Sequence, residues 1–106
     1  MYAIGDGVEK DAAEAVRYYR LAAEQGEFKS QCNLGLMYVQ GLGVPKDHVL
    51  AYAWAYLGAA NAGDEEKESV EIREDIGKSL PSAKRLKAEA LARKWLKDGL
   101  VRELSR

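Results

Sequence analysis

One pattern occurs twice in this 106-residue sequence, and its two copies lie 36 positions apart. The segments 2–15 and 38–51 share two turn glycines and five other residues at this offset. The matched pairs are Tyr2/Tyr38, Gly5/Gly41, Gly7/Gly43, Val8/Val44, Lys10/Lys46, Asp11/Asp47 and Ala15/Ala51. A fixed period of this length is typical of repeat proteins, in which each unit buries its apolar face by stacking on a neighbour. The chain is therefore predicted to be a repeat array.

Hydrophobic spacing predicts helices on both sides of the second glycine turn, at 29–40 and 48–62. On one face of the first helix, at i, i+4, i+7 and i+8, lie Ser30, Leu34, Met37 and Tyr38. Gly35 is inside this helix, where glycine costs about 1 kcal/mol relative to alanine. Such a glycine marks a place where another helix comes very close.

Turn residues indicate where these helices begin and end. Gly41 and Gly63 are expected to end the two helices, and Asp47 is expected to cap the start of the second one. Val44, within the turn, is expected to reach the core. The inward-facing residues of the second helix are predicted to be Ala51, Trp54 or Ala55, Gly58 and Ala59.

The first copy of the turn, at 2–10, precedes a helix predicted at 12–24. Gly5 and Gly7 suit positions that need positive φ, Asp11 is the expected N-cap and Gly26 the expected C-cap. The predicted buried stripe is Ala15, Tyr18 or Tyr19, Ala22 and Ala23, with Arg17, Arg20 and Glu24 pointing outward. A phosphate-binding loop is a poor alternative for the first turn, because the strand, the further glycines and the lysine of such loops are absent.

Two more helices are predicted at 64–78 and 83–98. The first opens with acidic residues, which oppose the positive end of the helix dipole, and its apolar stripe is Ile72, Ile76 and Leu80. In the break that follows, Ser79 or Ser82 is expected to cap the last helix. That helix offers for burial Leu86, Ala90, Leu91 and Trp95. Since this part departs from the repeat pattern, it is predicted to close the array.

Charge separates along the same part of the chain, because 64–75 is mostly acidic and 78–97 is mostly basic. The pattern predicts two antiparallel helices with complementary solvated faces. The alternative is a basic surface for nucleic acid or lipid headgroups. The adjacent acidic helix and the formal net charge of -1 argue against that alternative.

Length and composition set a few further limits. The chain is long enough for one domain, and it has one cysteine, Cys32, so an internal disulfide is impossible. It contains no run of 18 or more apolar residues. Met1-Tyr2 takes the place of Met37-Tyr38, so the first helix of the first unit is expected to be missing. We expect a fragment of a longer array, which leaves the cellular compartment open.

The motifs Leu34-Gly35-x-x-Tyr38, 41–47 (Gly-Leu-Gly-Val-Pro-Lys-Asp) and 22–26 (Ala-Ala-Glu-Gln-Gly) resemble Sel1-like repeats. The segment 51–63 looks like the last repeat of many bacterial members. The resemblance is close over 2–63 and looser over 64–98. It implies helix pairs stacked into a curved solenoid, similar to tetratricopeptide repeats, and an adaptor that binds proteins without chemistry of its own. One subset, described as β-lactamase-like, pairs two cysteines per repeat and does not fit a chain with Cys32 alone.

These observations predict an all-α fold, a short α–α superhelix of antiparallel helix pairs with a C-terminal capping helix. One domain is expected over 1–106, with a partial repeat at 1–27, a full repeat at 28–63 and a closing helix pair and tail at 64–106. The expected function is a non-catalytic protein–protein interaction module, monomeric or weakly dimeric. The alternative is a purely structural C-terminal cap of a longer array, with the partner bound elsewhere.

In related solenoids the first helix of each pair lines a concave binding surface, so the resemblance implies where a protein or peptide partner would bind. The candidate partner-binding residues are Lys29, Cys32, Leu36, Val39, Gln40, Ser69 and Arg73. Leu36 and Val39 would be apolar side chains left at the surface, which is a mark of interaction sites. If neighbouring helices cover this groove, the same residues belong to the core instead.

Catalytic, metal and cofactor sites are not expected. His48 is the only histidine, it is expected to face water near a helix start, and one histidine cannot make a zinc site. Cys32 has no assured cation or helix N-terminus beside it to lower its pKa, so a buried apolar role is expected for it. No nucleic acid and no direct membrane insertion are expected either.

Overall fold

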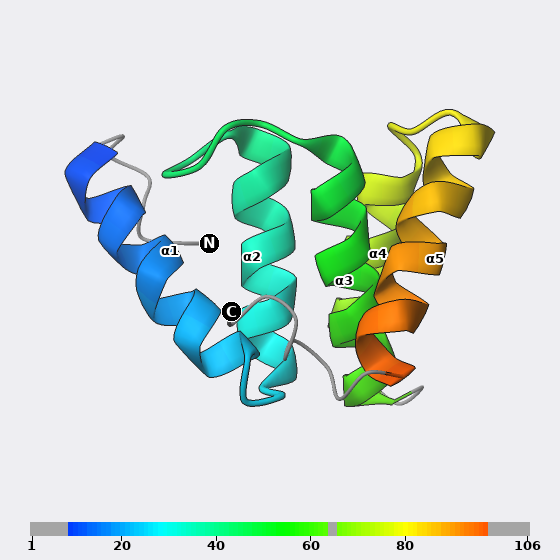
Figure 1. Ribbon diagram of the computed structural model, residues 1–106, viewed down its shortest axis with the longest axis horizontal. Coiled ribbons are helices and arrows are strands. Elements are labelled where there is room, and N and C mark those ends of the chain that lie inside the picture. The colour runs from blue at the N-terminus through cyan, green and yellow to red at the C-terminus, as the bar shows by residue number, and fades with distance from the viewer. Residues whose placement is uncertain (1–8, 64–65, 98–106) are drawn as a thin grey trace.

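The computed structural model describes residues 9–63 and 66–97, and within them the chain forms five α-helices and no β-strand. The helices are α1 (Glu9–Ala23), α2 (Phe28–Gln40), α3 (His48–Ala62), α4 (Lys67–Gly77) and α5 (Ser82–Lys97). Consecutive helices run in opposite directions, with α1 and α5 at opposite ends of the molecule (Figure 1). The predicted all-α fold is confirmed.

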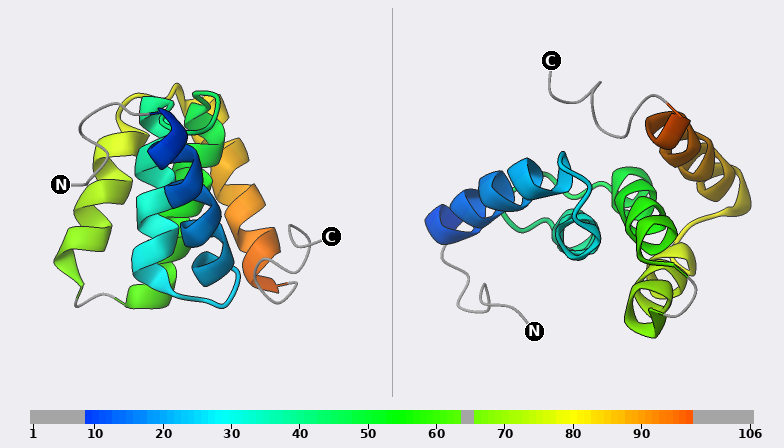
Figure 2. Two further views of the ribbon diagram at one scale, coloured as in Figure 1. Left: turned by 90° about the vertical axis from the view of Figure 1, so that its left-hand side faces the viewer. Right: turned by 90° about the horizontal axis from the view of Figure 1, so that it is seen from below.

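The centre of the molecule is α3, which packs against α2, α4 and α5. α4 and α5 lie on different sides of it (Figure 2). Because α3 has neighbours on several sides, eight of its fifteen residues are buried. They include both Trp54 and Ala55, between which the sequence left a choice. The predicted inward residues Ala51, Gly58 and Ala59 are also buried.

α2 and α3 approach each other closely through glycine. A Cβ atom at Gly35 would lie 2.8 Å from the Ala51 carbonyl oxygen and 3.3 Å from the Ala55 Cβ. A Cβ atom at Gly58 would lie 2.6 Å from the Cys32 sulfur. Two helix backbones can come this near only where side chains are small, so the close approach predicted at Gly35 is confirmed.

The turn predictions hold for the glycines within the described residues. Gly26 has φ 90° after α1, where its N–H donates to the Ala23 carbonyl (2.9 Å) and the Glu27 N–H donates to the Ala22 carbonyl (3.3 Å). This pair of bonds is a Schellman motif, which satisfies carbonyls left free at a helix end. Gly41 follows α2 with φ 70°. Gly5 and Gly7 lie outside the described residues.

The start and end of α3 are the predicted ones. Asp47 caps the helix, since its Oδ1 accepts a hydrogen bond from the Leu50 N–H at 3.0 Å. Gly63, with φ 90°, follows its last residue. In the preceding turn, Val44 packs against the core, and a Cβ atom at Gly43 would lie 2.6 Å from the Ala12 carbonyl oxygen. This turn therefore also contacts α1.

Two predictions about α1 are wrong. Asp11 is not the N-cap, because the helix already includes Glu9. Glu9 stands where the second unit has Pro45, and glutamate is a better helix former than proline. Arg20 does not point outward. It is half-buried, and its Nη2 donates to the Tyr38 hydroxyl of α2 at 2.8 Å.

The buried stripe of α1 also differs in part from the predicted one. Of the two tyrosines, Tyr19 packs against the core, while Tyr18 is 70% exposed. Ala23 is buried and Ala15 and Ala22 are half-buried. The remaining core positions of α1, Ala12 and Val16, were not predicted.

α4 is shorter at its start than predicted. It begins at Lys67, and Glu66 is its non-helical N-cap residue, whose N–H donates to the Gly63 carbonyl at 3.2 Å. Residues 64 and 65 lie outside the described residues. The predicted stripe is present, with Ile76 buried and Ile72 and Leu80 packed against the core.

The predicted cap and buried face of α5 are wrong in part. Ser79 donates instead to the Ile76 carbonyl at the end of α4 (2.7 Å), and Ser82 is the first residue of α5. The Pro81 carbonyl accepts the first helical bond, from the Arg85 N–H at 2.9 Å. Trp95 is buried as predicted and Leu91 is half-buried. The other buried residues are Ala88 and Ala92, whereas Leu86 and Ala90 are exposed.

Candidate functional site

A pocket of about 230 Å³ lies between the first halves of α2 and α4. Both helices are the first members of their helix pairs, the position from which a partner surface was expected. We call it the α2–α4 pocket, and it is lined by Phe28, Lys29, Cys32, Asn33, Glu66, Glu68, Ser69 and Ile72.

Helical spacing places these side chains on two facing surfaces. On α2, Asn33 follows Lys29 by four positions, and on α4, Ile72 follows Ser69 by three, so each pair shares a helix face. Phe28 and Ile72 supply half-buried apolar walls. The rim carries more negative than positive charge, because Glu66 and Glu68 face a single cation, Lys29.

Cys32 lies at the inner end of the pocket with only 3% of its surface exposed. Burial raises the pKa of its thiol, Glu66 and Glu68 raise it further, and the Ser69 hydroxyl acts in the opposite direction. The thiol therefore stays protonated at neutral pH, and a protonated thiol is a poor nucleophile. The buried, apolar role predicted for Cys32 is confirmed.

The pocket brings together three of the seven candidate residues, Lys29, Cys32 and Ser69. Lys29 is exposed, while Ser69, like Cys32, is buried.

The other four candidates do not line the pocket. Leu36 is half-buried and Gln40 is exposed further along α2. Val39 is half-buried against the core. Arg73 of α4 lies over the Tyr56 ring of α3, 5.8 Å from the ring centroid. A partner limited to the pocket would therefore not require these four residues.

The histidine of the chain does not belong to a metal-binding cluster of the described residues. His48 is half-buried as the first residue of α3. Residues 9–63 and 66–97 hold no cluster of three or more His, Cys, Asp or Glu side chains placed to bind a metal ion.

None of the helices in these two ranges combines the length and the apolar character that crossing a bilayer requires.

No signal in the sequence pointed to Gln31, which is fully buried and joins three helices. Its Nε2 donates to the Ala23 carbonyl at the end of α1 (3.0 Å), and its Oε1 accepts from Asn61 Nδ2 of α3 (2.8 Å). A buried amide needs such partners, since leaving one unpaired costs about 1–3 kcal/mol. A single polar residue at a core position of a helical pattern does not identify its partners.

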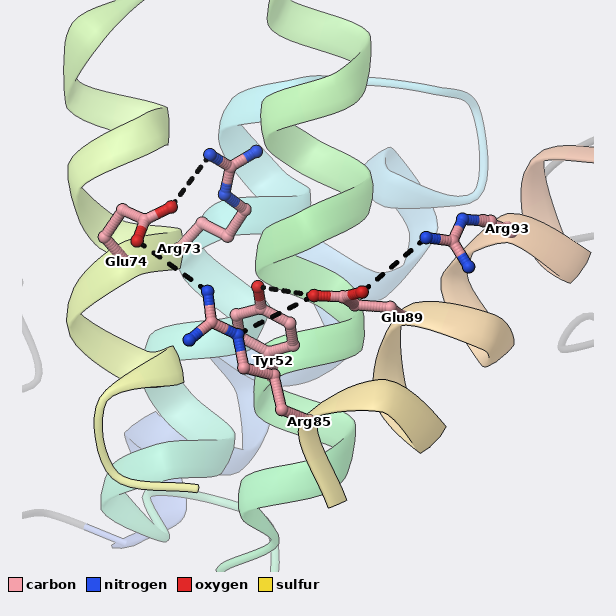
Figure 3. A network of polar contacts seen from close by, with 6 residues as sticks. All are labelled: Tyr52, Arg73, Glu74, Arg85, Glu89 and Arg93. Atoms are coloured by element: carbon pink, nitrogen blue, oxygen red, sulfur yellow. Dashed lines mark hydrogen bonds and ion pairs between the residues drawn. The ribbon is translucent and has the colours of Figure 1, made fainter. Parts of the chain in front are cut away.

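A polar network joins α3, α4 and α5 (Figure 3). Glu89 of α5 accepts from the Tyr52 hydroxyl (3.3 Å) and pairs with Arg85 (3.7 Å) and Arg93 (3.6 Å). Arg85 also reaches Glu74 of α4, at 3.9 Å. α4 and α5 therefore each pack on α3, and they meet each other mainly through side chains over Tyr52. The sequence predicted a more direct pairing, with the complementary faces of the two helices in contact.

Known families account for this arrangement of helix pairs. The model of the Sel1 repeat matches residues 1–27 and 28–63. The chain belongs to the Sel1 repeat family. Sel1 repeats are generally protein-interaction modules, and the predicted family is confirmed.

A solved Sel1-like structure shows the same fold. It is the crystal structure of a protective antigen present in uropathogenic Escherichia coli strains and displaying an SLR fold, which is 31% identical to this Sel1 repeat chain with a TM-score of 0.74. The similarity covers 91% of this chain and 21% of the antigen's chain, so this chain spans about a fifth of the antigen's length. No curated protein is detectably similar in sequence.

Proposed function

We propose that this Sel1 repeat chain is a non-catalytic adaptor that binds a segment of a partner protein in the α2–α4 pocket. The observation that carries the proposal is the pocket itself, which is open between the first helices of two successive pairs and has apolar walls with a charged rim. Its volume, about 230 Å³, is below the roughly 300–1,000 Å³ of typical small-molecule sites. A single bulky side chain of a peptide fits it better than a metabolite does.

The charges of the rim indicate which peptide would bind. Glu66 and Glu68 outnumber Lys29, so a segment with a basic residue next to an apolar anchor is favoured. Leu36 and Gln40 follow Asn33 by three and seven positions on the same face of α2. A longer segment laid along α2 would reach these two residues after it leaves the pocket.

A second candidate function is a structural cap, and the outer face of α4 favours it. The exposed residues of this helix and its C-cap are all charged, namely Lys67, Glu68, Glu71, Asp75 and Lys78. A terminal unit of a repeat array needs such a face, because no further unit covers it. In that case the partner binds elsewhere in a longer protein.

Peptides selected from a displayed random library separate the two candidates. Asn33→Trp fills the pocket from the half-buried Asn33 position, and Arg17→Trp adds the same ring at an exposed position of α1. We expect selected peptides to bind the unaltered chain and Arg17→Trp equally, and Asn33→Trp about tenfold more weakly. Circular dichroism verifies that both variants are folded.

The location of binding provides a second readout. NMR shift changes on peptide addition should cluster on Phe28, Asn33, Ser69 and Ile72. If no peptide is enriched, or if enriched peptides bind Asn33→Trp as well as the unaltered chain, the pocket is not a binding site and the cap is the better description.

A further inference from the structure

We propose that the outward face of α5 is a second binding surface, separate from the α2–α4 pocket, and that it binds an acidic amphipathic helix of a partner protein. We define this α5 face by its exposed residues, Ala83, Leu86, Lys87, Ala90 and Lys97.

The orientation of α5 is set by its buried side. Ala88, Ala92 and Trp95 are at most 2% exposed, and the Trp95 ring packs on Trp54 of α3 with 5.0 Å between centroids. Residues on the opposite side of α5 therefore point away from the molecule, at the end of the helix array (Figure 1).

The apolar part of the α5 face has the spacing of a helix-packing seam. Leu86 is 64% exposed, with Ala83 three positions before it and Ala90 four positions after it. These intervals correspond to alternating a and d positions of a heptad. The two small alanines leave room beside Leu86 for apolar side chains of a second helix.

The charged part of the α5 face selects an acidic partner. α5 carries six Lys or Arg residues and one Glu, and that glutamate, Glu89, already pairs with Arg85 and Arg93. Within the described residues, Lys87 and Lys97 form no ion pair. The ion pair that α4 makes with α5 joins Glu74 to Arg85 and involves neither of these lysines. Lys87 flanks Leu86, where a glutamate of a packed helix would meet it.

Two other anionic partners fit the α5 face less well. Interfacial membrane helices bury a broad apolar face with Trp, Phe or Leu, whereas Trp95 is buried in the core and Leu86 stands alone between alanines. A long nucleic acid would extend past α5 toward the exposed acidic side chains Glu68, Glu71 and Asp75 of α4, and no aromatic residue is exposed on the α5 face for bases to stack on.

The proposal is tested with a synthetic helical peptide that has Leu and Ala at heptad positions a and d and Glu at e and g. The glutamates repel each other, so the peptide does not pair with itself. We expect saturable binding to the unaltered chain, weakened by salt between about 0.05 M and about 0.5 M. Leu86→Ser and Lys87→Glu should each weaken it roughly tenfold.

Matched controls distinguish the α5 face from a general effect of charge or apolar surface. Leu21→Ser removes a similarly exposed leucine of α1, and Lys67→Glu reverses an exposed lysine of α4. Both controls, and the pocket variant Asn33→Trp, should bind the peptide like the unaltered chain. Retained binding in Asn33→Trp separates this proposal from the one on the pocket.

Four outcomes would overturn the proposal. The first is the absence of saturable peptide binding, and the second is an equal loss of peptide affinity in the control variants and in the α5 variants. The third and fourth are stronger binding to phosphatidylglycerol vesicles, or to double-stranded DNA, than to the peptide.

Discussion

At the scale of single residues, the fold depends on two glycines that let α2 and α3 approach each other. At Gly35 the nearest atom to an added Cβ is a backbone oxygen, at 2.8 Å, while at Gly58 it is the Cys32 sulfur, at 2.6 Å. A side-chain neighbour can be removed by mutation and a backbone neighbour cannot. Gly58 therefore allows a test of close packing that Gly35 does not.

We expect Gly58→Ala to lower the free energy of unfolding by about 1–3 kcal/mol, because an extra methyl group in a packed interface forces its neighbours to shift. In a Cys32→Ala background the same change should cost less, since the sulfur is gone and the next-nearest atoms, the Phe28 carbonyl oxygen and the Cys32 backbone nitrogen, lie at 3.0 and 3.1 Å. Urea denaturation of the four chains of this double-mutant cycle measures the coupling. Equal costs in both backgrounds would show that Cys32 does not limit the approach of the helices.

Cys32 also gives a prediction for pH. Its ordinary pKa is 9.0, and burial raises the value in the folded protein. Above about pH 9 the unfolded chain loses this proton while the folded chain keeps it, so the free energy of unfolding falls as pH rises, by at most about 1.4 kcal/mol per pH unit. Cys32→Ala should remove this part of the slope between about pH 9 and pH 10. An unchanged slope would mean that the thiol ionises equally well in both states.

At the scale of elements, α5 shows how tertiary packing selects the face of a helix. The sequence pattern offered both Leu86 and Trp95 for burial, but nine positions at about 3.6 residues per turn place them on opposite faces of one helix. Ala88 and Ala92 are fully buried on the face of α5 that also carries Trp95, whose ring packs on Trp54 of α3. Burial on α5 therefore follows the face that carries Trp95, and Leu86 lies on the opposite face.

This packing predicts a large difference between two substitutions on α5. Trp95→Ala should lower the free energy of unfolding by about 3–5 kcal/mol, since it removes a buried ring and leaves a cavity. Leu86→Ala, at a site that is 64% exposed, should change it by less than about 0.5 kcal/mol. Thermal or urea unfolding followed by circular dichroism measures both. Similar effects of the two changes would contradict this assignment of the buried face.

At the scale of the whole molecule, the five helices are held unequally. α3 packs on α2, α4 and α5, whereas α1 packs mainly on α2. Local opening is easiest where few buried contacts must be broken. Within the described fold we therefore expect α2 and α3 to be the most stable region and α1 to be the least stable helix.

Native-state hydrogen exchange tests this order. We expect amides of α3 to exchange only through global unfolding, and amides of α1 to exchange through local opening at a lower free energy. Arg20 and Tyr38 join α1 to α2 through one hydrogen bond, so Tyr38→Phe should speed exchange in α1 more than in α5. Equal protection of α1 and α3 would show that the array opens as a single unit.

The sequence by itself determined the repeat, the family, the presence of all five described helices and most of the turn positions. These features depend on local chemistry, because Gly26, Gly41 and Asp47 act on backbone groups within a few residues of themselves. Only the tertiary structure decided which side chains are buried and which residues meet. It placed Cys32 against Ser69 and turned Arg20 toward Tyr38, because each outcome depends on how two helices approach each other, and a helical period alone does not contain that distance.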